Sequence, residues 1–478
     1  MKPIKNILIV GGGTSGLVAA LILQKRFSKI KIHLVKSNKI GIIGVGEGST
    51  EHFGEFLNFT GITPKMLIQG ADATLKYGVV FENWTKETYF HNVTNGISSL
   101  VFGQYLSGYA HSIVNNFKPK KYTNGFCLDD MVLSNPYPNQ YHFNTFKLND
   151  FLIERCKLVG VKIFEDEIKD VIVKDGKINY LKGEKKKYKY DFYIDSTGFK
   201  KLLISKLGAK WNSYKDYLPM NEAIAFPTKD TEEYAPYTLS RAMKAGWMWR
   251  IPTYGRWGNG YVFNNNYINK DEAQQECEKY LGHKIKIGKN IKFEAGALDK
   301  AWIGNCVAVG LSSSFMEPLE ASSIGTSIQQ AFLLMHLLPF HSEKDISLYN
   351  QRFSSIVENI RDFVQLHYVV NKKDSKFWKE LKLNLTDTLK YNLEKWKHRL
   401  PIREDFLGGY KLFNENNFTI ILKELGLFNN EKIKYTHDSL SADLKGDTFN
   451  LIRDFIRDNE NGFTFTKHKE FLDKIRKT

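Results

Sequence analysis

An α/β fold is predicted by three features at the start of the chain: a short apolar strand, a helix with apolar residues at helical spacing, and a second strand. The first strand covers residues 6–10, the helix residues 17–27 and the second strand residues 30–34. The turn between strand and helix carries Gly11, Gly13 and Gly16. A Gly-x-Gly-x-x-Gly turn in this context is typical of a βαβ unit that binds a dinucleotide.

The residues of this turn have separate expected tasks. Gly11 permits the tight turn, Gly13 lets the backbone approach a pyrophosphate, and Gly16 lets the helix pack on the strand. Thr14 and Ser15 stand in the turn just before the helix, whose N-terminus would face the phosphates. We therefore expect all five residues to contribute to the dinucleotide site.

Lys36 departs from the usual pattern of such units. An acidic residue normally stands about twenty residues after the glycines and binds the adenosine ribose. This chain has Lys36 followed by Ser37. The ribose contact is therefore in doubt, and two expectations remain open: Lys36 meets a phosphate, or the nucleotide binds more weakly.

A second strand and turn are predicted at residues 191–199, where Asp195 and Gly198 would close the nucleotide site. Asp195 has an alternative interpretation as a cap at the strand end. Before this segment, residues 149–160 resemble a helix capped by Asn149, and Asp175-Gly176 is a hairpin signal.

Composition limits the possible classes of protein. The 478 residues are 42% hydrophobic and 14% aromatic, which supports a large packed core and excludes disorder. The net charge of +16 favours a lysine-rich surface over nucleic-acid binding, because the dense run at residues 185–189 resembles a solvated hairpin. The apolar stretch at residues 7–23 is broken by glycines, so we expect no membrane span.

Cysteine and metal-ligand spacing give little support for metal or disulfide chemistry. The four cysteines, Cys127, Cys156, Cys277 and Cys306, are widely separated. Neither a disulfide framework nor a Cys-x-x-Cys site is indicated, so a reducing cytoplasm is the expected location. No cluster of histidine, aspartate and glutamate has metal spacing, and we expect no metal.

Residues 246–252 read Gly-Trp-Met-Trp-Arg-Ile-Pro, and residues 315–320 read Phe-Met-Glu-Pro-Leu-Glu. Alone, the first segment fits a strand that buries Trp247 and Trp249 on one face. Together with the glycine turn, these segments resemble the flavin-dependent halogenases, whose marker is Trp-x-Trp-x-Ile-Pro beside a dinucleotide fold. The resemblance runs from about residue 6 to about residue 380.

The resemblance implies a dinucleotide-binding flavoprotein fold of the two-module flavin monooxygenase type. Residues 1–330 would form an FAD-binding module with an interleaved substrate-facing sheet, and residues 331–478 a mainly helical substrate module. It also implies an enzyme that uses reduced FAD, oxygen and halide to make hypohalous acid and to halogenate an electron-rich aromatic small molecule. Two alternatives are a flavin-dependent aromatic monooxygenase and a non-catalytic binding protein.

Two catalytic residues follow from the resemblance. Residues 71–84 are similar to the halogenase segment with the catalytic lysine, which matches Lys76. Apolar neighbours would partly desolvate its ammonium. Glu320 matches the catalytic glutamate and would act as general base. Glu317 is better explained as a charge at a helix N-terminus.

The flavin and halide sites are implied in the same way. Ser322 and Ser323 match the positions whose backbone amides bind halide, although the family usually has Ser-Thr-Gly where this chain has Ala-Ser-Ser. Gly46 and Glu47 lie in a segment similar to the flexible flavin strap. Trp247 and Trp249 would line the flavin end and exclude organic substrate.

The resemblance also concerns residues that would contact the substrate. Phe90 and His91 lie where halogenases stack an aromatic ring. Phe418 and Thr419 align with the tyrosine pair that binds free tryptophan, so free tryptophan is not implied. His367 is expected to be structural. No second nucleotide fingerprint is seen, so a separate flavin reductase would supply reduced FAD.

Overall fold

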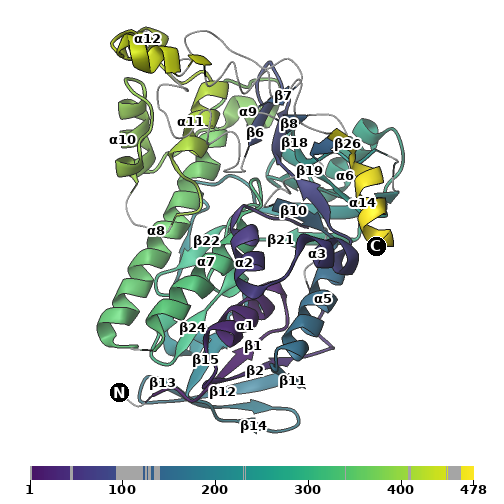
Figure 1. The fold of residues 1–478 in the computed structure, drawn as a ribbon, viewed down its shortest axis with the longest axis vertical. Coiled ribbons are helices and arrows are strands. Elements are labelled where there is room, and N and C mark those ends of the chain that lie inside the picture. Colours follow the sequence, from purple (N-terminus) through teal and green to yellow (C-terminus); the bar gives the residue numbers. More distant parts are fainter. Residues whose placement is uncertain are drawn as a thin grey trace.

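The predicted α/β fold is present, with its parallel strands at one end of the molecule (Figure 1). The computed structural model describes residues 3–42, 47–92, 122–123, 126–127, 131–133, 140–229, 231, 233–339, 341–406, 411–447, 449–450 and 465–478. Every structural statement below concerns these residues. Among their helices, none is long and apolar enough to span a membrane.

The first sheet contains the dinucleotide-binding unit. Its described strands, in spatial order, are β11 (Lys162–Glu165), β2 (Lys31–Lys36), β1 (Asn6–Val10), β15 (Phe192–Asp195), β24 (Cys306–Ala308) and β23 (Trp302–Ile303). All neighbours pair in parallel except β23 and β24. Strand β1 lies inside the sheet and is buried on both faces, which explains its unbroken apolar run. The βαβ prediction is confirmed.

Helices cover this sheet and extend to the opposite end of the molecule. The described α-helices are α1 (Thr14–Arg26), α2 (His52–Thr60), α3 (Pro64–Ala71), α5 (Thr145–Leu158), α6 (Lys270–Leu281), α7 (Ser322–Leu337), α8 (Glu343–His367), α9 (Lys376–Glu380), α10 (Asp387–Trp396), α11 (Glu415–Glu424), α12 (Asn430–Asp438) and α14 (His468–Lys477). Helix α8 runs along one side of the molecule from the parallel sheet towards α10 and α11 (Figure 1). Helix α1 packs against α5 and α7.

A second sheet carries the Trp-x-Trp segment. Its described strands, in spatial order, are β21 (Lys289–Lys292), β17 (Glu222–Lys229), β20 (Arg256–Phe263), β19 (Gly246–Thr253), β18 (Tyr237–Met243), β5 (Gly78–Glu82) and β6 (Tyr89–Asn92). Since β19 lies between β18 and β20, Trp247 and Trp249 belong to an inner strand. Their side chains share one face of the sheet with His91, because the register keeps opposite residues on the same side.

A small sheet brings three distant segments together beside this face. It consists of β3 (Glu47–Gly48), β10 (Gln140–Phe143) and β4 (Thr74–Lys76), with β10 in the middle. The other described strands are β7 (Tyr122–Thr123), β8 (Phe126–Cys127), β9 (Met131–Leu133), β12 (Ile168–Lys174), β13 (Lys177–Gly183), β14 (Lys187–Tyr188), β16 (Trp211–Ser213), β22 (Gly296–Leu298), β25 (Ser314–Phe315) and β26 (Phe465–Lys467).

Two local predictions had different outcomes. The hairpin at Asp175-Gly176 is confirmed, because both residues have positive φ and join the antiparallel strands β12 and β13. The helix start at Asn149 was wrong. Helix α5 begins at Thr145, since Asn144 is its N-cap and accepts a hydrogen bond from the Phe146 N–H.

The C-terminal part is mainly helical, as expected. The boundary proposed at residue 330 falls inside α7, so a division into two modules would have to come after Leu337. A continuous apolar core also joins both parts and includes Ile7, Leu334, Phe363 and Leu472. The two-module division therefore remains a prediction.

Helix α14 returns to the N-terminal half and supports strand β4 through His468. The Leu75 N–H donates to His468 Nε2 at 2.9 Å, and Nδ1 lies 2.9 Å from the Tyr234 carbonyl oxygen. A backbone N–H only donates and a carbonyl only accepts, so the proton must be on Nδ1. Burial lowers the pKa of His468 to about 4, and the ring is therefore neutral near neutral pH.

We predict that His468→Ala lowers the free energy of unfolding by about 3 kcal/mol, because it leaves the Leu75 N–H and the Tyr234 carbonyl buried without partners. Urea unfolding of the cofactor-free protein measures this. Lys474→Ala, an exposed change on the same helix, should alter stability by no more than about 0.5 kcal/mol. Equal stability of the two variants would contradict the supporting role of His468.

Candidate active site

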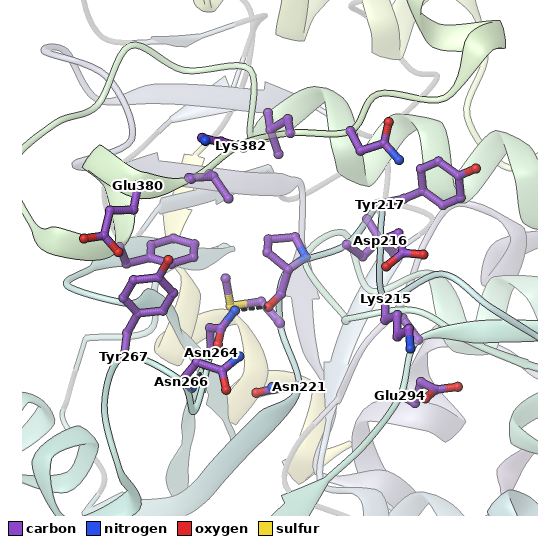
Figure 2. A pocket seen from close by; sticks show the side chains of 18 of the residues that line it. Lys215, Asp216, Tyr217, Asn221, Asn264, Asn266, Tyr267, Glu294, Glu380 and Lys382 are labelled. Atoms are coloured by element: carbon purple, nitrogen blue, oxygen red, sulfur yellow. Dashed lines mark hydrogen bonds between the residues drawn. The ribbon is translucent and has the colours of Figure 1, made fainter.

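A large cavity runs between the parallel sheet and the Trp-x-Trp sheet. It has a volume of about 610 Å³, and its wall includes the glycine turn, Lys36, Gly198, Trp249, Ser322 and Ser323. A second cavity of about 560 Å³ shares Phe293 with it and is lined by polar side chains such as Asn221, Asn264 and Tyr267 (Figure 2). The second cavity is lined by none of the predicted site residues, so the first is the candidate site.

At one end of this cavity, the glycine turn has the geometry that a pyrophosphate requires. Gly11 has φ +117°, and a Cβ there would come within 2.1 Å of the Ser196 carbonyl oxygen. A Cβ on Gly16 would clash with the Gly11 carbonyl oxygen, so this glycine is needed for helix packing. Helix α1 is capped by Gly13, which has no side chain to occupy the first N–H groups. These groups remain available to an anion.

Lys36 lies beside this turn rather than away from it. A Cβ on Gly12 would meet the Cβ, Cγ and Cδ atoms of Lys36 at 2.7–3.3 Å, so the lysine stem crosses the turn. Lys36 also lines the cavity. Lys36 thus lies at the glycine turn and within the cavity wall.

Asp195 holds the second turn but does not line the cavity. Its Oδ2 accepts from the N–H groups of Leu203 and Ile204, and its Oδ1 accepts from the Thr197 N–H, the Thr197 hydroxyl and the Ser312 hydroxyl. The carboxylate is thus fully used as a cap, which was the alternative interpretation. Ser196, Thr197 and Gly198 of the same turn line the cavity.

The strap segment is described only at its ends. Gly46 lies outside the described residues, and Glu47 is placed by its backbone in β3. On the near side, Lys289 Nζ donates to the Ile42 carbonyl oxygen at 2.7 Å. On the far side, Gly48 lines the cavity and lies next to the ammonium of Lys76.

The far wall of the cavity is the start of helix α7. Its N-cap is Ala321, a non-glycine residue with φ +55°, and no side chain caps the first turn. Ser322 and Ser323, the first helical residues, line the cavity together with Ala321. Uncapped N–H groups and the helix dipole make this end suitable for a small anion.

The two tryptophans have different surroundings. Trp249 lines the cavity and lies flat over Gly260, where a Cβ would come within 2.0 Å of the indole. Trp247 instead donates its Nε1–H to Glu317 Oε2 at 2.7 Å. The Tyr368 hydroxyl donates to the same oxygen at 2.5 Å. Trp247 is therefore an anchor for the Glu317–Glu320 turn.

Glu317 is fully buried, and the expectation of a helix-end charge does not describe it. Its Oε1 has no hydrogen-bond partner among the described residues. Burial raises the pKa of Glu317 to about 7, although the bonds from Tyr368 and Trp247 oppose this.

Lys76 is also fully buried, as expected for a catalytic lysine. Its Nζ donates to the Ser49 carbonyl oxygen at 2.7 Å. Burial lowers the pKa of Lys76 to about 8, although the negative charge of Glu320 opposes this shift. A sizeable fraction of the side chain is thus neutral and nucleophilic in mildly alkaline solution.

Glu320 is held by two imidazole rings that lie far apart in the sequence. Its Oε1 is 2.8 Å from His91 Nδ1 and 2.9 Å from His367 Nε2, and all three side chains are fully buried. Burial alone would raise the pKa of Glu320, but the charges and hydrogen bonds of the two histidines outweigh it and lower the pKa to about 2. Its Oε2 has no partner in the described part of the chain.

The other nitrogen of each ring also has a partner. His367 Nδ1 lies 2.8 Å from the Phe363 carbonyl oxygen and must donate to it. His91 Nε2 lies 3.1 Å from Asn417 Nδ2. Both rings are thus fixed on two sides, and His367 contacts the Glu320 carboxylate directly, which the expectation of a structural role did not include.

Phe90 does not share this site with His91. Neighbouring residues on a strand point to opposite faces, and Phe90 packs over Gly78, where a Cβ would touch its ring at 2.6 Å. The prediction that both residues contact one substrate ring therefore disagrees with the strand register. His91 remains on the side of Glu320 and Lys76.

Sequence reasoning missed His142, which connects the cavity wall to the small sheet. Its Nε2 lies 2.9 Å from the Thr238 hydroxyl, and its Nδ1 lies 3.4 Å from the Thr74 hydroxyl, which donates to the Pro252 carbonyl oxygen. Thr238 lines the cavity. A lone histidine in a buried strand has no periodic signal that distinguishes it from a core residue.

Phe418 and Thr419, which align with the tyrosine pair of the tryptophan halogenases, have other contacts in this structure. Phe418 packs among Phe363, Trp396 and Phe406, and the Thr419 hydroxyl donates to the Glu415 carbonyl oxygen. Neither offers a grip for an amino-acid group. Within the described residues, no group of three or more His, Cys, Asp or Glu side chains is arranged to hold a metal.

Comparisons with known proteins agree with this geometry. The sequence profile described as tryptophan halogenase matches residues 6–439. The chain is 29% identical over 468 residues to the tryptophan 6-halogenase SttH of Streptomyces toxytricini, covering 88% of this chain and 89% of that protein. The tryptophan halogenase structure from Shewanella frigidimarina superposes with a TM-score of 0.89 at 25% identity, covering 100% and 98% of the two chains. Xcc4156, a flavin-dependent halogenase from Xanthomonas campestris, gives 0.84 at 26% identity, covering 99% of each.

We predict that Glu317→Gln changes the pH dependence of stability. A raised pKa means that the stability contributed by protonated Glu317 is complete below about pH 4.5 and is lost as pH rises through about 7. The glutamine still accepts from Trp247 and Tyr368 but does not ionise. Relative to wild type, the variant should gain about 2–3 kcal/mol between about pH 5 and pH 8. Urea unfolding of the cofactor-free proteins measures this difference, and a constant difference would refute it.

Proposed function

We propose residue roles and a substrate class on one premise: the chain belongs to the tryptophan halogenase family. It is therefore a flavin-dependent halogenase, an enzyme that acts on aromatic substrates, and the alternative of a flavin monooxygenase is set aside. Membership implies FAD and halide as cofactor and co-substrate. The proposal below assigns this chemistry to individual side chains.

The large cavity fits FAD, because it combines an uncapped helix N-terminus with a glycine turn that no side chain could replace. The glycine turn, Thr14 and Ser15 would bind the pyrophosphate, with Lys36 on a phosphate oxygen. Reduced FAD, when bound, supplies the two electrons with which oxygen converts halide and a proton into hypohalous acid and water. We also propose that a separate cytoplasmic reductase delivers reduced FAD.

Halide would bind at the start of α7. The support is the uncapped first turn at Ser322 and Ser323, which faces the cavity. Trp249 would cover the cavity wall nearby and keep organic substrate away from the flavin. Trp247 would act indirectly by fixing Glu317, and through it the start of α7.

Lys76 and Glu320 would perform the halogenation. Hypohalous acid formed in the cavity reaches Lys76 near Gly48, where the ammonium either donates a hydrogen bond to it or, as a neutral amine, takes the halogen and releases water. The aromatic carbon then bonds to the halogen as the oxygen–halogen or nitrogen–halogen bond breaks, and the departing hydroxide or the lysine nitrogen takes up a proton. The free Oε2 of ionised Glu320 accepts the ring proton, and this unpartnered oxygen beside a buried lysine is the observation that carries the assignment.

The substrate proposed is an electron-rich aromatic small molecule, such as a phenol, aniline or indole. His91 would contact the ring edge or position Glu320. Because Phe418 and Thr419 are turned into the protein, no grip for a free amino acid is proposed.

We predict that Lys76→Ala lowers halogenation at least about 100-fold while the flavin is reoxidised at nearly the normal rate, because the lysine acts after the halide has been oxidised. Mass spectrometry of an aromatic library with reductase, chloride and bromide measures the product. Flavin absorbance measures reoxidation. Normal product yield would exclude Lys76.

Glu320→Gln tests the second catalytic residue in the same assay. The amide retains the hydrogen bond to His91 but loses the basic oxygen, so turnover should fall strongly with little loss of substrate affinity. Unchanged turnover would place the general base elsewhere.

We predict weak binding of oxidised FAD, so that the purified protein is largely colourless, because Lys36 replaces the ribose carboxylate. Lys36→Glu should weaken FAD binding further, by about 1–2 kcal/mol, because the ammonium proposed to bind a phosphate oxygen is lost and a carboxylate takes its place beside the pyrophosphate. Calorimetric titration measures both proteins. Stoichiometric yellow flavin in the wild type would contradict the prediction.

A further inference from the structure

Gln140 is a fully buried amide with no hydrogen-bond partner in the described part of the chain. It is 0% exposed, and neither Oε1 nor Nε2 makes a hydrogen bond with any described residue. A buried amide without partners loses its bonds to water and gains none in return. Gln365 shows the ordinary arrangement: its amide bonds to Tyr217, Asn384 and Thr386.

The register of the small sheet places Gln140 beside the catalytic lysine. Gln140 is directly opposite Lys76 in the pairing of β10 with β4, so both side chains are on one face. Lys76 begins on β4 and bonds to the Ser49 carbonyl beyond β3. Its side chain therefore crosses β10.

Gln140 and His142 lie on opposite sides of this crossing. His142 contacts Gly48 and Thr238, which both line the flavin cavity. Gln140 is two residues along the same face and does not line that cavity. It therefore faces the side of Lys76 that is away from the flavin, where the substrate belongs in the proposed function.

Other buried polar atoms without hydrogen-bond partners among the described residues lie near the proposed substrate side of Lys76. Glu320 Oε2 and the Tyr89 hydroxyl are buried and have no hydrogen-bond partner among the described residues. The charge of Glu320 contributes to the raised pKa of Tyr89, after burial, so the two groups are close. Glu320 is ionised and only accepts, which suits the ring proton and disfavours a negatively charged substrate group.

We propose that Gln140 recognises an amide-like substituent on the aromatic substrate. The side-chain amide offers one acceptor and one donor next to each other, and a carboxamide or lactam presents the same pair in reverse. Two hydrogen bonds would then satisfy both atoms at once. An ester lacks the donor, and a carboxylate lacks the donor and is repelled by Glu320. The inference rests on Lys76 as the halogenating residue.

Binding to the cofactor-free protein tests this recognition without any reaction. The probes are meta-hydroxybenzamide, its matched methyl ester and the free acid, measured by calorimetry. Wild type should bind the amide about tenfold or more tightly than the ester, and the acid most weakly. Gln140→Met should remove the preference for the amide. Equal affinity of wild type for amide and ester would overturn the proposal.

Stability gives an independent readout. Without substrate, the buried and unpartnered amide of Gln140 lowers the stability of the protein. Gln140→Met should therefore raise the thermal unfolding midpoint by about 1–3 °C. Gln365→Met is the matched control and should lower it, because it breaks three existing bonds. If Gln140→Met also lowers the midpoint, the amide has a structural partner and the proposal fails.

Halogenation assays separate this inference from the proposed function. If wild type halogenates phenols but Gln140→Met leaves the preference for amide over ester unchanged in KM, the inference is overturned and the function stands. If wild type halogenates neither these probes nor any phenol, aniline or indole of the aromatic library while the binding preference is present, the proposed substrate class fails and recognition by Gln140 is supported.

Discussion

The turn from Glu317 to Glu320 is held by two adjacent side chains at the end of α8, and both sides of the active centre depend on it. Tyr368 donates to Glu317, and His367 binds Glu320. Between the two glutamates, Pro318 and Leu319 line the large cavity. The C-terminal end of α8 therefore positions both the cavity wall and the carboxylate of Glu320, so displacement of α8 would disturb both.

The same turn shows how burial and partners give two identical side chains opposite properties. Glu317 receives only neutral donors, and its pKa rises to about 7. Glu320 meets the charges and hydrogen bonds of His91 and His367, which outweigh the effect of burial, and its pKa falls to about 2. The two histidines thus offset the cost of a buried charge, and Glu320 stays ionised with its Oε2 unpartnered among the described residues.

Local features of this fold could be predicted from the sequence, whereas the assembled site could not. The glycine turn and the Asp175-Gly176 hairpin are fixed by neighbouring residues and are confirmed. The cluster around Glu320 joins positions 91, 320 and 367, which only tertiary packing brings together. His367 looked structural for that reason. By contrast, the alternation of side chains along a strand could have been predicted from the sequence, and in β6 it places Phe90 and His91 on opposite faces.

The bond between His468 and the Leu75 N–H links residues 393 positions apart. Closing so long a loop is slow, because its entropy must be lost before the contact forms. On the ribosome, strand β4 therefore lacks its support until residue 468 has emerged, long after the FAD-binding turn has been made. The FAD-binding turn is thus synthesised early, and strand β4, which carries Lys76, gains the hydrogen bond from His468 only at the end of synthesis.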